Sequence, residues 1–122
     1  MTTSAMATVL AWHDALNEKD FDTLLQLSSP DIEVGDSQGA RQGHQALLEW
    51  LNSTGITALP GRMYVHDNVV VVEEQIAAGG REAAPAATAF RVVDDDVVSV
   101  FRHDDLGSAL RATGLTEADL VE

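Results

Sequence analysis

The sequence predicts an α+β fold in which N-terminal helices lie on one face of a curved antiparallel sheet. Apolar residues recur at steps of three and four in the first half of the chain. The second half is rich in β-branched residues and is divided by short polar turns. Helical patterns that precede the strands, instead of alternating with them, are typical of α+β folds. A chain of 122 residues is also the size of one domain, so we expect residues 1–122 to fold as a single unit.

Three amphipathic patterns in the first half predict helices near residues 5–17, 20–28 and 43–53. Residues that favour helix N-termini precede the first two helices, and a Ser-Ser-Pro sequence is expected to end the second. Residues 32–34 are expected to be extended, and the polar, glycine-containing stretch after them predicts a loop or a tight hairpin. Residues 52–61 are expected to be a connector.

The second half predicts four strands, at residues 62–66, 69–77, 85–93 and 97–103. Their separators have the composition of hairpin turns: Asp67-Asn68, Gly79-Gly80 and Asp94-Asp95-Asp96. Hairpins join antiparallel neighbours, so the sheet is expected to be antiparallel. A last apolar pattern, residues 106–112, predicts a short C-terminal helix.

The composition argues against several classes of function. The chain has no cysteine, which rules out disulfides, thiolate metal sites and a cysteine nucleophile. Its 20 acidic and 7 basic residues give a net charge of −13, whereas nucleic acids and anionic membranes are bound by clustered Lys and Arg. The longest aliphatic run, residues 69–72, is far too short to span a bilayer, and the N-terminal residues lack the basic stretch of a signal peptide. We therefore expect a cytoplasmic protein that binds neither nucleic acid nor membrane.

Short motifs along nearly the whole chain occur in a characteristic order. They are Trp12-His13-Asp14-Ala15-Leu16-Asn17, Asp20-Phe21-Asp22-Thr23-Leu24, Pro30-Asp31-Ile32-Glu33-Val34, Arg41-Gln42-Gly43-His44-Gln45-Ala46-Leu47, and Asp105-Leu106 with Leu110 and Gly114-Leu115. In this order they resemble the nuclear-transport-factor-two-like superfamily, which includes ketosteroid isomerases, SnoaL-type polyketide cyclases and limonene epoxide hydrolase. The resemblance implies a cone-shaped α+β barrel, in which a strongly bent sheet wraps a long helix and encloses a mostly apolar pocket that is open at one end.

The resemblance to ketosteroid isomerases also implies a site. It places Asp36 on the carboxylate that moves a proton between carbons of the substrate. The tyrosine and the protonated aspartate of the isomerase oxyanion hole match Trp12 and Thr88 here, and neither of these is an acidic donor. The ligand pocket is expected to be lined by Asp36 together with Trp12, Leu16, Trp50, Met63, Thr88 and Phe90.

Residue chemistry leaves the role of these side chains open. A partly desolvated aspartate within reach of a carbon acid is a general base, but Asp36 between Gly35 and Ser37 is equally typical of a turn. Aromatic residues such as Trp12 and Phe90 are as common in ordinary cores as in binding sites.

Further polar residues stand in apolar surroundings. Glu73 and Glu74 place a carboxylate on each face of an apolar strand, so the inward one is a second acid–base candidate, although the sequence does not tell which it is. His13 lies in the apolar face of the first helix, where a hydrogen-bonded core histidine is the usual case. His44, His66 and His103 lack metal-ligand spacing, so we expect no metal site. Proton transfer by a carboxylate needs no organic cofactor, and none is expected.

Three functions remain open at this point. The first is an isomerase, cyclase or dehydratase that uses Asp36 as general base on a small apolar or polycyclic ligand. The second is a ligand-binding or protein-interaction module without catalysis. The third is epoxide hydrolysis, which in related proteins uses an Asp-Arg-Asp relay. The candidate arginines for such a relay are Arg62, Arg91 and Arg102.

A homodimer is also expected, because related proteins pair through the outer face of the sheet and because an uncovered sheet face needs a partner. Val93, Val98 and Val100 are the expected apolar contacts.

Overall fold

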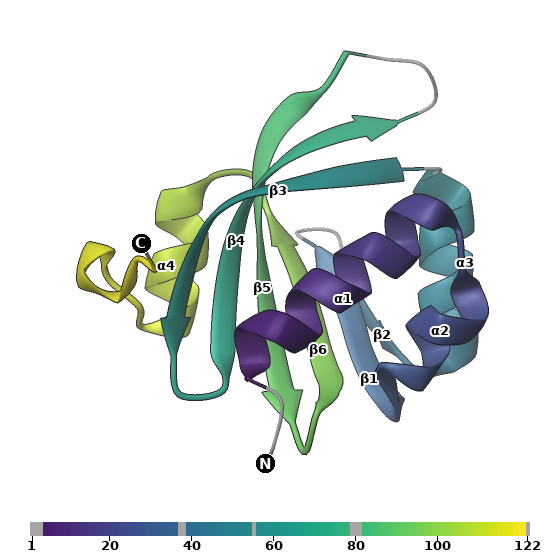
Figure 1. The fold of residues 1–122 in the computed structure, drawn as a ribbon. Coiled ribbons are helices and arrows are strands. Elements are labelled where there is room, and N and C mark those ends of the chain that lie inside the picture. The colour runs from purple at the N-terminus through teal and green to yellow at the C-terminus, as the bar shows by residue number, and fades with distance from the viewer. Residues whose placement is uncertain (1–3, 37–38, 55, 79–81, 122) are drawn as a thin grey trace.

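The computed structural model describes residues 4–36, 39–54, 56–78 and 82–121. A curved, open sheet of six strands lies at its centre, in the order β2-β1-β6-β5-β4-β3. Figure 1 shows α1 crossing one face of this sheet, with α2 and α3 next to it, whereas α4 lies against the opposite face. The predicted fold class, helices against a curved sheet in a cone, is confirmed.

The N-terminal helices are α1 (Ala5–Glu18), α2 (Phe21–Gln26) and α3 (His44–Thr54). The Ser4 side chain accepts a hydrogen bond from the backbone of the first turn of α1, and Asp20 does the same for α2. The three predicted helices are therefore present. The second ends two residues early, because Ser28 pairs with β6 and already belongs to a strand.

The strands are β1 (Ser28–Asp36), β2 (Gly39–Gln42), β3 (Ile56–His66), β4 (Val69–Ala78), β5 (Ala84–Val93) and β6 (Asp96–His103). All four strands predicted in the second half are present. The expected connector at residues 52–61 is wrong, because β3 begins at Ile56 and pairs with β4 along its length. Pro60 is tolerated there because β3 is an edge strand and its register shifts between Pro60 and Met63.

The turns between strands follow the sequence signals. Asp94 and Asp95 both have positive φ, 51° and 67°, as a two-residue turn between antiparallel strands requires. Gly79-Gly80 lies outside the described residues. Gly35 permits the β1–β2 hairpin to close, because a Cβ there would lie 2.6 Å from the Gly39 carbonyl oxygen.

One pair of strands departs from the expected antiparallel sheet. β1 runs parallel to β6, so the sheet is mixed. About half of the chain lies between the two strands, and no local turn signal reports their direction. Hairpin signals therefore predicted the antiparallel pairing of β3 to β6 correctly, and they did not indicate the pairing of β1 with β6.

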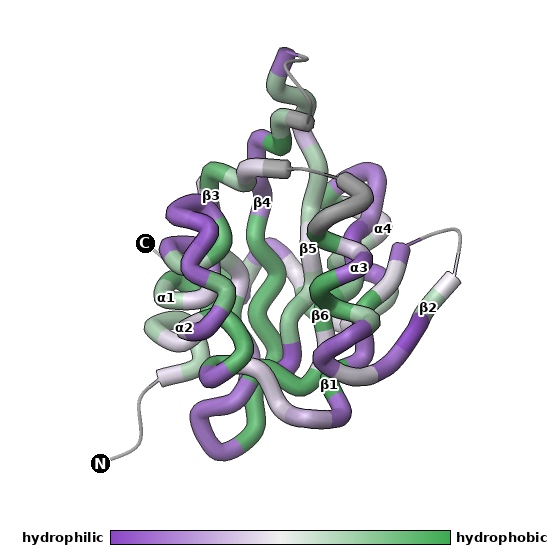
Figure 2. Tube along the Cα trace, turned by 90° about the vertical axis from the view of Figure 1, so that its right-hand side faces the viewer, coloured by the Kyte–Doolittle hydropathy of each residue, from purple (hydrophilic) through white to green (hydrophobic). Residues whose placement is uncertain are grey.

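The two faces of the sheet pack against different helices. The inner face and α1 to α3 form the main core, whereas the outer face packs against α4 (Leu106–Thr113) and a short 3₁₀ helix (Glu117–Asp119). Figure 2 shows the hydrophobic residues of the central strands gathered in the middle of the molecule. Val100 lies in the inner core with 1% of its surface exposed, so its assignment to an outer dimer contact is wrong. Within the described ranges, no helix combines the length and the apolarity that a membrane span requires.

Candidate functional site

A small internal cavity lies between α1, α3 and the inner face of the sheet. Its walls are Trp12, Leu16, Trp50, Ala58, Glu74, Thr88, Phe90, Val100 and Arg102. Five of the seven residues expected to line the pocket are thus brought together. Met63 is buried in the core, and Asp36 lines a different depression. The cavity measures about 10 Å³. This is room for about one water molecule, whereas ligand pockets usually measure about 300–1,000 Å³.

Ring contacts and hydrogen bonds hold the aromatic wall of the cavity. The rings of Trp12 and Phe90 meet edge to face with centroids 5.3 Å apart. The indole N–H of Trp12 donates to Ser28 Oγ at 3.1 Å, and Ser28 in turn donates to the Leu24 carbonyl at 2.8 Å. Trp12 therefore offers the cavity its ring surface, and its single donor is already used.

Four polar side chains collect at one end of the inner face. In the strand register Thr88 on β5 lies opposite Arg102 on β6. Val34 on β1 pairs with Val100 on β6. Asp36 comes two residues after Val34, and Arg102 comes two residues after Val100. The two side chains therefore lie next to each other on the same face. On β4, Val72 pairs with Thr88. Glu74 comes two residues after Val72 on the same face and completes the group. We call Asp36, Arg102, Thr88 and Glu74 the polar row.

Arg102 is the arginine that faces the interior. Its guanidinium lies 4.6 Å from the ring centroid of Trp50, in a cation–π contact. Burial lowers the pKa of Arg102, and the carboxylates of Glu74 and Asp36 oppose this shift. The other two candidates lie outside the cone, since Arg62 pairs with Glu73 at 2.9 Å on the surface and Arg91 is exposed.

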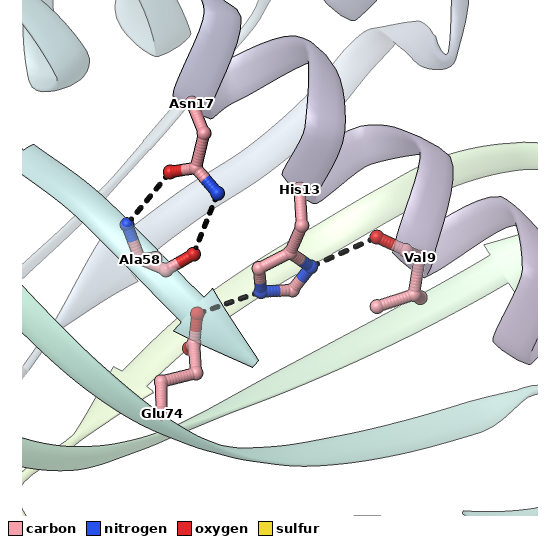
Figure 3. A network of polar contacts seen from close by, with 5 residues as sticks. All are labelled: Val9, His13, Asn17, Ala58 and Glu74. Atoms are coloured by element: carbon pink, nitrogen blue, oxygen red, sulfur yellow. Dashed lines mark hydrogen bonds and ion pairs between the residues drawn. The ribbon is translucent and has the colours of Figure 1, made fainter. Parts of the chain in front are cut away.

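Glu74, and not Glu73, is the glutamate that points inward. Figure 3 shows its carboxylate meeting the ring of His13 from α1, with Oε2 and Nε2 2.7 Å apart. The other ring nitrogen, Nδ1, lies 2.8 Å from the carbonyl oxygen of Val9. His13 and Glu74 are 1% and 3% exposed, so this hydrogen-bonded pair lies entirely inside the protein.

Asp36 lies at the edge of this arrangement. It is partly buried at the end of β1, and it lines a depression of about 340 Å³ near the start of α4 instead of the internal cavity. Arg102 lines both spaces and so connects Asp36 with the interior. Ser37, beside which the sequence left Asp36 a role in a turn, lies outside the described residues.

The chain matches the family model of the SnoaL-like domain over residues 9–105. It belongs to the SnoaL-like domain family. Among proteins with curated functions, none matches the sequence.

Solved structures show the same fold at low sequence identity. An NTF2-like protein of unknown function from Cytophaga hutchinsonii has a TM-score of 0.77 at 16% identity, covering 93% of this chain and 97% of that one. A protein assigned to the polyketide cyclases from Sinorhizobium meliloti has a TM-score of 0.71 at 20% identity, with 82% and 99% covered. TerC, co-crystallised with polyporic acid, has a TM-score of 0.75 at 16% identity, with 87% and 95% covered. At these identities the likeness establishes the fold.

Proposed function

We propose that this SnoaL-like protein is an enzyme of the isomerase, cyclase or dehydratase type. It transfers a proton on a small, mostly apolar ligand held inside the cone, with Asp36 as general base. The observation that carries this proposal is the position of Asp36 beside Arg102, whose side chain reaches an interior walled by aromatic and aliphatic groups. A carboxylate next to a partly buried cation, at the edge of an apolar site, can take a proton from carbon while the cation stabilises the charge that develops.

A ligand can enter where the wall of the cavity is least buried. Trp50 is only partly buried, whereas Trp12 and Phe90 are 2% and 1% exposed. Movement of Trp50 would enlarge the cavity without disturbing the packing of α1 on the sheet. The related cyclase and the TerC complex with polyporic acid support a small organic ligand for this fold.

Hydrogen exchange at carbon tests the general base without knowledge of the natural substrate. The probe is 2-tetralone, an apolar bicyclic ketone with acidic C–H groups, and the measurement is deuterium incorporation from D₂O by proton NMR. Asp36→Asn keeps the shape of the side chain but removes the proton acceptor, so the catalysed rate should fall by about 10²–10⁴. Asp31→Asn, at an exposed position of the same strand, is the matched control and should leave the rate unchanged.

Full exchange activity in Asp36→Asn would show that Asp36 is not the base. Binding of the ketone by the wild type without any exchange would favour the second candidate, a ligand-binding module without catalysis. Epoxide hydrolysis remains a third candidate because Arg102 interacts with two carboxylates, Asp36 and Glu74, as a carboxylate-arginine-carboxylate relay requires. Release of a diol from styrene oxide that depends on Arg102 would favour it.

We also propose a homodimer formed through the outer face of the sheet. Val93 is 44% exposed, and Val98 lines a groove of about 680 Å³ on that face. Light scattering coupled to size exclusion should give twice the monomer mass of 13.0 kDa. A single species of monomer mass at micromolar concentration would overturn this assembly.

A further inference from the structure

Unpaired charges of opposite sign border the groove on the outer face of the sheet. The groove measures about 680 Å³, and the half-buried ring of Phe101 on β6 lies among its lining residues. Glu33 on β1 and Arg91 on β5 also line it, and both are exposed. Within the part of the chain that the structure describes, neither of these two side chains forms a hydrogen bond or an ion pair. An apolar centre with charges at its rim is typical of a surface that binds another protein.

The two charges lie on opposite sides of β6. Glu33 pairs in register with Ser99 on β6, and Ser99 pairs with Arg91. Neighbouring strands are about 5 Å apart, so the backbone positions of the carboxylate and the guanidinium are about 10 Å apart. Asp31 adds a second carboxylate on the β1 side of the groove. The outer face is therefore negative on one side of β6 and positive on the other.

A second copy of the chain is complementary to this arrangement. Two identical faces meet through a two-fold axis that lies in the plane between them, and every contact then occurs twice. An axis along β6 exchanges the β1 side with the β5 side, so Arg91 of each copy faces Glu33 of the other. An axis across the strands sets Arg91 against Arg91 and Glu33 against Glu33.

The net charge of the protein favours the first of these axes. Each copy carries a charge of −13, so two copies repel each other unless their contact pairs opposite charges. Like charges that face each other across an interface weaken it strongly. Arg91 over the carboxylates of a second copy removes this repulsion within the contact.

The shape of the outer face favours the same axis. α4 packs on this face against residues of β4 and β5, on one side of β6 (Figure 1). The groove lies beside α4, between the last residues of this helix and β1. Rotation about β6 places α4 of each copy over the groove of the other, whereas rotation about the axis across the strands places α4 against α4 and leaves both grooves open.

We propose that the protein forms a two-fold dimer whose axis runs along β6, in which Arg91 of each subunit pairs with Glu33 of the partner subunit. The inference rests on the homodimer proposed above. It goes further in naming the orientation of the two copies and the charged side chains that select it.

Reversal of either charge tests the pairing. Arg91→Glu and Glu33→Arg each place like charges opposite each other at both positions of the dimer. Each variant alone should raise the dissociation constant of the dimer about a hundredfold. Light scattering coupled to size exclusion measures it in low salt, and circular dichroism checks that the variants are folded.

A mixture of the two variants tests the orientation and the pairing together. Chains with Arg91→Glu and chains with Glu33→Arg carry opposite charges at both positions, so they should form a heterodimer about as stable as the wild-type dimer. Native mass spectrometry distinguishes the two chains by mass. The double variant Arg91→Glu with Glu33→Arg exchanges both charges within one chain and should form a homodimer again.

Control variants separate the pairing from a general effect of charge. Lys19→Glu and Asp14→Arg make the same changes in charge at exposed positions of α1 and its C-terminal cap, on the other side of the sheet. Both should dimerise like the wild type. At about 1 M salt, where charges are screened beyond about 3 Å, the loss of affinity in Arg91→Glu should become smaller.

A monomeric wild type overturns the homodimer and this inference together. A dimeric wild type with both charge reversals as tightly dimeric as it is leaves the homodimer standing and overturns the pairing. So do monomeric single variants whose mixture forms no heterodimer, because the substitutions then disturb the face in another way. Equal weakening by Lys19→Glu and Arg91→Glu also overturns the pairing.

Discussion

The two ends of the inner face of the sheet differ in composition although they lie under the same helices. At one end, aliphatic side chains such as Ile32, Val70 and Val97 are completely buried and form a continuous core. At the other end, the inner-face positions of four neighbouring strands hold the residues of the polar row, and Glu74 in this row pairs with His13. Aliphatic residues at the polar end would stabilise the fold at least as well, because a buried ion pair rarely contributes net stability. The contrast separates an end that packs the fold from an end whose polar groups suit the site proposed there.

Removal of one partner of the buried pair should have the largest effect on stability. His13→Phe leaves the Glu74 carboxylate without its partner, and we expect a loss of about 3–5 kcal/mol in the free energy of unfolding. Urea denaturation followed by circular dichroism measures it. The double variant His13→Phe with Glu74→Met removes both charged groups and should be as stable as the wild type or more stable. A double variant as unstable as the single one would contradict the view that the pair does not serve folding.

A truncation at the apolar end should cost a similar or smaller amount. Leu47 in α3 is completely buried in the main core, and Leu47→Ala is expected to lose about 2–5 kcal/mol, from lost burial and from the cavity that remains. The same denaturation measurement applies. This variant should keep the exchange activity towards 2-tetralone while it is folded. Loss of that activity would mean that the two ends are not separate in function.

The smallest effect is expected outside both ends, at the surface cap of α4. Asp105 accepts a hydrogen bond from the Ser108 backbone N–H at 2.7 Å, and this contact is the main reason that the pKa of Asp105 lies below its usual 3.8. Because folding lowers this pKa, the stabilisation is complete above the usual value and is lost as the pH falls through the lower folded value. Asp105→Asn keeps the capping oxygen but cannot titrate.

The expected Tm difference between wild type and Asp105→Asn is a few degrees at most near neutral pH. It should narrow below about pH 4, where the aspartate of the unfolded wild type also takes up its proton. Thermal melts at several pH values measure the difference. A difference that does not depend on pH would contradict an electrostatic contribution from Asp105.

Local patterns in the sequence predicted the parts of the fold that depend on local structure. Apolar periodicity placed the helices, and turn residues such as Asp94 and Asp95 placed the hairpins. The parallel pairing of β1 with β6 and the early start of β3 depend on residues far away in the chain, so no local signal reported them.

The candidate site divides in the same way. The resemblance to known proteins brought together most of the residues that line the cavity, because the shared fold places them there. The partner of His13, and the face to which Glu74 points, follow from the register of β4 with β3 and β5 and from the position of α1 above them. Alternation along β4 predicted that either Glu73 or Glu74 points inward, without telling which. The structure shows Glu73 paired with Arg62 on the outer face, so Glu74 is the inward one.

The side chain of Asn17 bears on how the open edge of the sheet avoids pairing with strands of other molecules. β3 is an edge strand of an open sheet, and such edges invite pairing with strands of other molecules. Asn17 on α1 accepts a hydrogen bond from the Ala58 N–H at 2.9 Å and donates one to the Ala58 carbonyl at 2.8 Å. One amide thus satisfies both backbone groups that this residue would otherwise present to an incoming strand. The helix that covers the interior also protects the edge of the sheet against aggregation.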